Sequence, residues 1–175
     1  MIKYIITMIL AALTLMANPK GNSMENLTEI YLGGGCFWGT QGYFDLINGV
    51  VYSEVGYANG ISDQTSYNQI ARTDHAEVVR LKFDANRVDI NEILEHYFRI
   101  IDPFSINKQG NDIGRQYRTG IYYSDDKLKS VIEDFISRKQ AKFTKPIAVE
   151  IEPLKNYIKA EEYHQKYLDK NPNGY

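Results

Sequence analysis

The chain has 175 residues, 43% of them hydrophobic, and a formal net charge of −2. This is enough length and apolar content for one domain with a real core, which we expect over residues 24–175. The near-neutral charge and the lack of a basic stripe argue against a nucleic-acid partner, and we expect a monomer. One cysteine and three dispersed histidines predict no internal disulfide and no metal site.

The first residues form a pattern of their own. A short positive segment ends at Lys3, an almost wholly apolar run follows to Leu15, and the small residue Ala17 precedes a polar stretch. This pattern predicts a secretory signal peptide and short linker over residues 1–23, and therefore an exported protein in the periplasm or another extracytoplasmic space. The alternatives are an uncleaved membrane anchor and, if translation starts at Met24, a cytoplasmic form.

Cys36 stands in the segment GGGCFWG at residues 33–39. The preceding residues 29–32 predict a strand, and the following residues, through Phe44 and Ile47, predict a helix. Cys36 is therefore expected in the first helical turn, where unpaired backbone N–H groups and the positive end of the helix dipole stabilise a thiolate. A buried, unreactive cysteine is the competing interpretation, and the three glycines and Trp38 favour the nucleophile.

Strand and helix patterns alternate further along the chain. A capping-box pair at Asp89 and Glu92 predicts the start of a helix that ends before Pro103, and the polar residues 102–117 predict a functional loop. Strand-helix-strand occurs twice, which predicts an α/β (α+β) fold: a two-layer sandwich with a mixed sheet, a split βαβ ferredoxin-like core and extended coil segments. The remaining predicted elements are strands at 50–57, 76–83, 118–123 and 147–151, and helices at 128–136 and 160–168.

Several motifs follow the cysteine segment. With that segment, they closely resemble the A-type peptide methionine sulfoxide reductases, in a single-cysteine form. The likeness runs from about Ile30 to Tyr175, and although each motif alone is weak, all of them in order are highly specific. The motifs are Thr65-Ser66-Tyr67, HAEVV at 75–79, NKQGNDIGRQYR at 107–118, EEYHQ at 161–165 and NPNGY at 171–175.

The resemblance implies an oxidoreductase that reduces methionine (S)-S-oxide, free or in proteins, to methionine and so repairs oxidised proteins. Its cysteine would pass through a sulfenic acid and be restored by an external thiol such as thioredoxin, without a cofactor. The match positions make Cys36 the nucleophile, Glu77 the acid, Tyr67 and Tyr117 the hydroxyl donors, Asp112 the substrate-orienting carboxylate, and Phe37 and Trp38 the wall that holds the methyl group.

The chemistry asks for residues of these types. A sulfoxide sulfur is a poor electrophile until its oxygen is protonated or strongly hydrogen-bonded, so the attacking thiolate needs an acid across that oxygen. Glu77 can serve only if burial raises its pKa, while two tyrosine hydroxyls would stabilise the developing charge. By residue type alone, Glu77 is also an ordinary exposed strand carboxylate, Asp112 an ordinary turn residue, and each tyrosine a core or rim residue.

Two features depart from the family pattern. Many relatives carry recycling cysteines near the C-terminus, whereas these 175 residues contain no cysteine besides Cys36. We therefore expect the sulfenic acid to be reduced directly by a thioredoxin-like, glutaredoxin-like or small thiol. The family's His-Asp-Pro-Thr before the long loop is Ile-Asp-Pro-Phe at 101–104, which we expect to change loop packing or the pocket rim more than the chemistry.

Two other functions compete with this interpretation. A thiol peroxidase or cysteine hydrolase would pair Cys36 with a histidine base, for which His75 is the candidate; the alternative for His75 is a structural role at a strand end. A noncatalytic module would bind methionine-containing peptides in an aromatic pocket. His164 either hydrogen-bonds near the site or faces solvent.

Overall fold

A mixed sheet of six strands forms the centre of the molecule, in the order β7-β6-β1-β3-β2-β8. The structure is a computed structural model that describes residues 27–173, and the signal peptide predicted at 1–23 lies outside the described residues. A separate hairpin, β4 (Lys108–Gln109) with β5 (Asp112–Ile113), lies in the long loop. The strands of the main sheet are β1 (Leu27–Gly34), β2 (Val50–Ala58), β3 (Ala76–Asp84), β6 (Thr119–Tyr123), β7 (Glu150–Pro153) and β8 (Ile158–Lys159).

The four central strands have the predicted ferredoxin-like arrangement. β1 and β2 are both antiparallel to β3, which lies between them, so the two strands and the helix α1 (Phe37–Asp45) form a split βαβ unit. β3 and β6 flank β1 in the same way, and α3 (Ile90–Ile100) lies in the connection between them. β7 adds beside β6 in parallel. The prediction of a two-layer α/β sandwich with a mixed sheet is confirmed.

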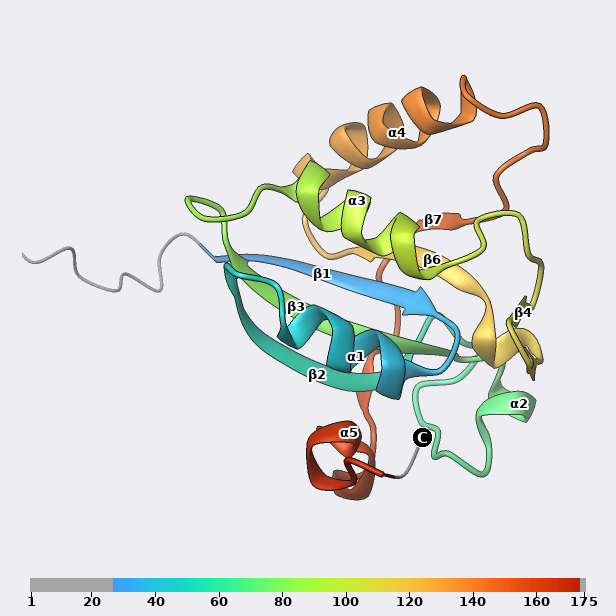
Figure 1. Cartoon of the computed structure of the whole chain (residues 1–175). Coiled ribbons are helices and arrows are strands. Elements are labelled where there is room, and N and C mark those ends of the chain that lie inside the picture. Colours follow the sequence, from blue (N-terminus) through green and yellow to red (C-terminus); the bar gives the residue numbers. More distant parts are fainter. Residues whose placement is uncertain (1–26, 174–175) are drawn as a thin grey trace, which may run out of the picture.

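The helices α1, α3 and α4 (Lys127–Gln140) pack on one face of the sheet and bury the main core between them. Figure 1 shows α1 and α3 lying across the strands on this side. The predicted capping box of Asp89 and Glu92 is present at the start of α3. Among the described residues, 27–173, no helix is long and apolar enough to cross a membrane. The remaining helical elements are α2 (Ile70–Thr73), η2 (Arg115–Tyr117), η3 (Glu162–His164) and α5 (Tyr167–Lys170).

The opposite face of the sheet is covered by chain without regular structure. Tyr31, Val78 and Tyr122 form a smaller cluster there, and Leu154 and Tyr157 from the coil between β7 and β8 pack against it. The rings of Tyr31 and Tyr157 meet edge-on, with 4.9 Å between their centroids. Successive side chains of β1 therefore point to opposite faces: Ile30 and Leu32 face the helices, and Tyr31 faces the coil.

The prediction of a final helix at 160–168 is wrong. The chain forms the single turn η3, leaves the helical path at Gln165 and Lys166, and only then begins α5. Lys166 has a left-handed backbone with φ of 52°, and the Gln165 amide bonds to the backbone N–H and C=O of Val55 in β2. Long-range side-chain bonds thus override the local helical pattern. The strand predicted at 147–151 also begins later, at Glu150.

Candidate active site

Cys36 is the N-cap residue of α1, directly before the turn in which the sequence predicts it, and its side chain is half-buried. The chain reaches it through Gly35, whose φ is +79° and where an added β-carbon would lie 2.6 Å from Cβ of Gln109. Only glycine satisfies both the left-handed backbone and this close approach. The thiol therefore lies at the positive end of the helix, where a thiolate is stabilised.

Glu77 lies in the core beside the start of α1. It points to the same face of β3 as Val79, which is two residues on and in the main core, and it is 1% exposed. Its Oε2 accepts the backbone N–H of Phe37 at 3.0 Å. Burial raises the pKa of Glu77 to about 8; the Phe37 bond opposes this rise, and the charge of Asp112 adds to it. The condition for Glu77 to act as an acid, a pKa raised by burial, is therefore met.

Tyr67 and Tyr117 come from different parts of the chain and meet near Glu77. Burial is the largest cause of the raised pKa of each tyrosine, and the charge of Glu77 is the second. Each tyrosine also shifts the pKa of the other, and the charge of Cys36 raises the pKa of Tyr67. The structure therefore brings together the thiol, the carboxyl and both hydroxyls that the sequence singles out, and both hydroxyls stay protonated at neutral pH.

The indole of Trp38 is held on two sides. Tyr167 stacks on it, with 3.6 Å between the ring centroids and 7° between the planes, and its Nε1–H donates to Nδ1 of His164 at 3.1 Å. His164 is 1% exposed, so it hydrogen-bonds in the site and does not face solvent; burial lowers its pKa, which favours the neutral ring. Phe37 is also 1% exposed, and its ring packs against that of His164 with 5.1 Å between the centroids.

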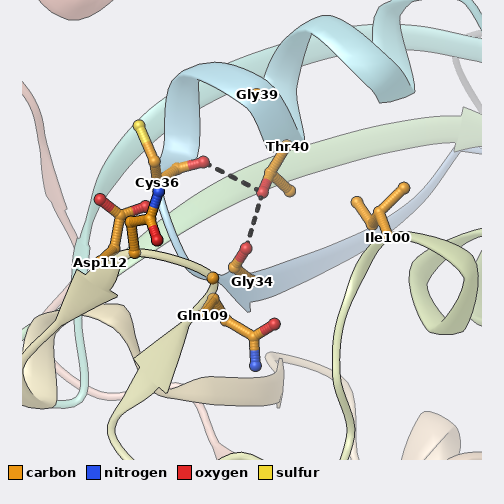
Figure 2. Close-up of a pocket in the computed structure, with 9 residues that line it drawn as sticks. Gly34, Cys36, Gly39, Thr40, Ile100, Gln109 and Asp112 are labelled. Carbon is orange, nitrogen blue, oxygen red and sulfur yellow. Dashed lines mark hydrogen bonds between the residues drawn. The ribbon is translucent and has the colours of Figure 1, made fainter.

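A hollow of about 550 Å³ opens beside Cys36. Figure 2 shows Cys36 and Asp112 at one end of it and Ile100 at the other. Among the predicted site residues, Cys36 and Asp112 are the two that line it, so the hollow adjoins the group formed by Glu77 and the tyrosines without enclosing it. The lining residues are Gly34, Cys36, Gly39, Thr40, Ile100, Gln109, Gly110, Asn111 and Asp112.

Two supporting residues are not singled out by the sequence. Glu161 accepts the backbone N–H of Tyr67 at 3.0 Å and the hydroxyl of Tyr57 at 2.7 Å, so it fixes the loop that carries Tyr67. Gln109 bonds to the backbone N–H and C=O of Asp102, at 2.8 and 2.9 Å, and closes the long loop. Both occur in the quoted motifs, but nothing in their residue type predicts which distant group each one binds.

His75 has the surroundings of a structural residue. It is 0% exposed, its Nδ1 lies 2.9 Å from Oγ1 of Thr73, and its ring packs against Gly60 so closely that no side chain fits there. Ile101, at the departure from the family pattern, is part of the main core, and Phe104 packs edge-on against Phe143. Within residues 27–173, no group of three or more histidine, cysteine or acidic side chains is placed to hold a metal ion.

The sheet, the thiol at a helix N-terminus and the buried carboxyl beside it form a site that suits thiol-based redox chemistry. The family described as peptide methionine sulfoxide reductase matches residues 28–175, and the chain belongs to this family. The resemblance found in the sequence motifs is thereby confirmed.

Solved structures of family members are similar to this chain over most of its length. Mxr1 from Saccharomyces cerevisiae in reduced form is 39% identical, with a TM-score of 0.80 over 87% of this chain and 90% of that one. Methionine sulfoxide reductase A of Corynebacterium diphtheriae is 34% identical, with a TM-score of 0.76 over 87% and 79%. Mxr1 in complex with Trx2 is 30% identical, with a TM-score of 0.60 over 82% and 86%.

Proposed function

We propose that this enzyme reduces methionine (S)-S-oxide, free and in proteins, with Cys36 as the nucleophile, and that it repairs oxidised proteins. The observation that carries the proposal is the Glu77 carboxyl, which is 1% exposed, has a pKa of about 8 and binds the first N–H of the helix that Cys36 caps. A protonated carboxyl beside a thiol suits sulfoxide reduction, whereas a cysteine hydrolase needs a base there.

The first step transfers oxygen from the substrate to the enzyme. The Cys36 thiolate attacks the sulfoxide sulfur while Glu77 donates its proton to the oxygen, and Tyr67 and Tyr117 donate hydrogen bonds to the same oxygen. Because Oε2 of Glu77 accepts from Phe37, Oε1 is the atom that carries the proton. The attack forms a bond between the Cys36 sulfur and the substrate sulfur. The protonated oxygen then moves as hydroxyl to the Cys36 sulfur while the S–O bond of the substrate and the new S–S bond break, so methionine leaves reduced by two electrons and Cys36 becomes a sulfenic acid.

The substrate side chain is held by apolar contact and by one charge. Trp38, fixed between Tyr167 and His164, offers a flat apolar surface for the methyl group, and the buried Phe37 packs against His164. Asp112, half-buried beside Cys36, orients the substrate. Because the acid and the wall are fixed relative to one another, one sulfoxide epimer places both its oxygen and its methyl group correctly.

Two external thiols restore Cys36. The first thiol attacks the sulfenic acid, forms a mixed disulfide and releases water; the second displaces the Cys36 thiol and leaves a disulfide between the two reductant sulfurs. We propose a thioredoxin-like, glutaredoxin-like or small thiol for this role, and no cofactor takes part. Support comes from the relative Mxr1, which has been solved in complex with Trx2, and from the presence of a single cysteine in these 175 residues.

We further propose that the protein is exported, on the basis of the signal-peptide pattern at residues 1–23. Cell fractionation followed by amino-terminal sequencing tests this. A chain that begins just after Ala17 in an extracytoplasmic fraction is expected. A chain that begins at Met1 in membranes, or at Met24 in the cytoplasm, would overturn the proposal.

The test of the function uses separated S and R epimers of a peptide methionine sulfoxide, dithiothreitol, residues 24–175 and the Cys36→Ser variant. We expect turnover of the S epimer alone, no detectable turnover by the variant, and an unchanged circular dichroism spectrum. Without reductant, one methionine and one sulfenic acid, trapped by dimedone, should form per chain. Turnover retained by Cys36→Ser, or turnover of neither epimer by folded and reduced enzyme, would refute the assignment.

A further inference from the structure

Lys166 connects the segment after η3 to α1 and β2 through both its backbone and its side chain. Its N–H donates to Oε1 of Gln41 at 2.8 Å. Its Nζ donates to both carboxylate oxygens of Asp45, at 2.7 and 2.8 Å, and to Oγ of Ser53 at 2.8 Å. Ser53 in turn donates to Asp45 at 2.6 Å and accepts from Gln41 at 3.1 Å. The four side chains therefore form a closed network, which we call the Lys166 network.

The backbone at Lys166 is one that lysine rarely adopts. Its φ of 52° lies in the left-handed region, which is uncommon for residues other than glycine, asparagine and aspartate. This conformation separates η3 from α5 and turns the next residue, Tyr167, back toward α1. The Lys166 network therefore stabilises a turn that the local sequence does not favour.

The residues on either side of this turn are the two that hold Trp38. His164 accepts the indole N–H and Tyr167 stacks on the indole face. On α1, Gln41 and Asp45 follow Trp38 by three and seven residues, so the three side chains lie on one helix face. That face therefore carries both the wall and the side chains that bind Lys166.

The contact between α5 and this face of α1 is tight. A β-carbon added at Gly42 would lie 2.9 Å from Cδ1 of Leu168. The space enclosed among Trp38, Lys166, Tyr167 and their neighbours is too small to hold a water molecule. A change in the backbone conformation of Lys166 would therefore displace the Tyr167 ring that stacks on Trp38.

We propose that Lys166 is a positioning residue for the methionine sulfoxide site: its network holds Tyr167 and His164 against Trp38 and so fixes the wall for the substrate's methyl group. Lys166 acts through Tyr167 and touches neither the substrate nor the reacting atoms. The proposal rests on the proposed function, because it takes Trp38 as that wall. A wall contact is made in both the ground state and the transition state, so its loss raises KM and leaves kcat nearly unchanged.

Trp38 is the single tryptophan of the chain, so its fluorescence reports on the wall independently of activity. Lys166→Asn is the main variant, because asparagine tolerates the left-handed backbone but lacks the amine. Lys166→Arg restores a cation opposite Asp45. Lys139→Met is the matched control, since the Lys139–Glu95 ion pair at 2.6 Å joins α4 to α3, and the Lys166–Asp45 pair measures 2.7 Å.

We expect Lys166→Asn to raise KM for a peptide methionine sulfoxide about fivefold with kcat within about twofold. Its Trp38 emission should shift to longer wavelength and be quenched more strongly by acrylamide. Lys166→Arg should recover most of both effects, and Lys139→Met should show neither. Circular dichroism and melting curves confirm that each variant is folded.

Unchanged acrylamide quenching in folded Lys166→Asn would overturn the proposal. So would increased quenching with an unchanged KM, or a fall in kcat alone. Absence of turnover by the wild-type enzyme would instead refute the proposed function, and the quenching comparison would still decide whether Lys166 holds Trp38.

Discussion

The reacting groups and the wall beside them are built in different ways. Cys36 and Glu77 lie at the ends of β1 and β3, which are joined by a backbone ladder, and the Phe37 amide links the carboxyl to α1. The partners of Trp38 lie on short helical pieces that are held by the side chains of Gln165 and Lys166. A backbone ladder fixes a reacting group for as long as the fold exists, whereas a side-chain network can be altered one residue at a time. Substrate fit is therefore separable from the chemistry.

Among changes to the reacting groups, which the β1–β3 backbone ladder holds in place, we expect Glu77→Gln to have the largest effect on the rate. The amide keeps the Phe37 bond but cannot donate a proton, so we expect the single-turnover rate of sulfenic-acid formation to fall roughly 100- to 1,000-fold with little change in substrate binding. Rapid-quench measurement of methionine released per chain gives this rate. An unchanged rate would remove Glu77 as the acid.

The same variant has a pH signature. With a pKa of about 8 for Glu77, the wild-type rate should fall above pH ~8 as the proton is lost, and Glu77→Gln should lack that fall. The folded protein also keeps this proton between the ordinary glutamate pKa of 4.5 and about 8, so the stability that the buried, protonated carboxyl contributes is lost as pH rises through that window. Glu77→Gln should therefore gain in melting temperature over wild type at pH 9 and not at pH 4; an equal difference at both pH values would contradict the burial argument.

Tyr67 and Tyr117 are both proposed to donate a hydrogen bond to the sulfoxide oxygen, so their variants measure how much the hydroxyls add to the effect of Glu77. Tyr67→Phe and Tyr117→Phe should each lower the single-turnover rate roughly tenfold, and the double variant should lose more than either, because one hydroxyl partly replaces the other. Tyr163→Phe, at an exposed tyrosine next to His164, is the control and should keep the wild-type rate. A full rate in the double variant would show that neither hydroxyl binds the sulfoxide oxygen.

His75→Ala should affect the chemistry least. Because His75 is fully buried and bonded to Thr73, its removal leaves a cavity that lowers the free energy of unfolding by about 2–4 kcal/mol. The single-turnover rate at a temperature where the variant is folded should stay within about threefold of wild type. Denaturant titration and the rapid-quench assay separate the two effects, and a large loss of rate without loss of stability would revive the histidine-base alternative.

The sequence predicts well the positions of the reacting groups, which lie beside the paired strands β1 and β3. The strand, glycine run and helix pattern place Cys36 at the start of α1, and the strand pattern at 76–83 places Glu77 in β3. These are local, repetitive signals, and the structure agrees with them.

The wall is the part that the sequence predicts poorly. Residues 160–168 have apolar spacing typical of a helix, yet the Gln165 amide binds β2 and Lys166 adopts a left-handed backbone. Those bonds join residues more than a hundred positions apart, and no periodicity encodes them. The stack of Tyr167 on Trp38 depends on the same turn, so the sequence shows the aromatic residues without showing which ring meets which.

Phe37 belongs to the core and to the site at once. Its ring is 1% exposed beneath α1, and its N–H binds Glu77. The amide cannot meet solvent unless a core aromatic is withdrawn, so its hydrogen exchange should proceed only through global unfolding. On heating, the acid loses its position in the same transition in which the fold is lost, and the residual activity at each temperature therefore measures the fraction of molecules that are still native.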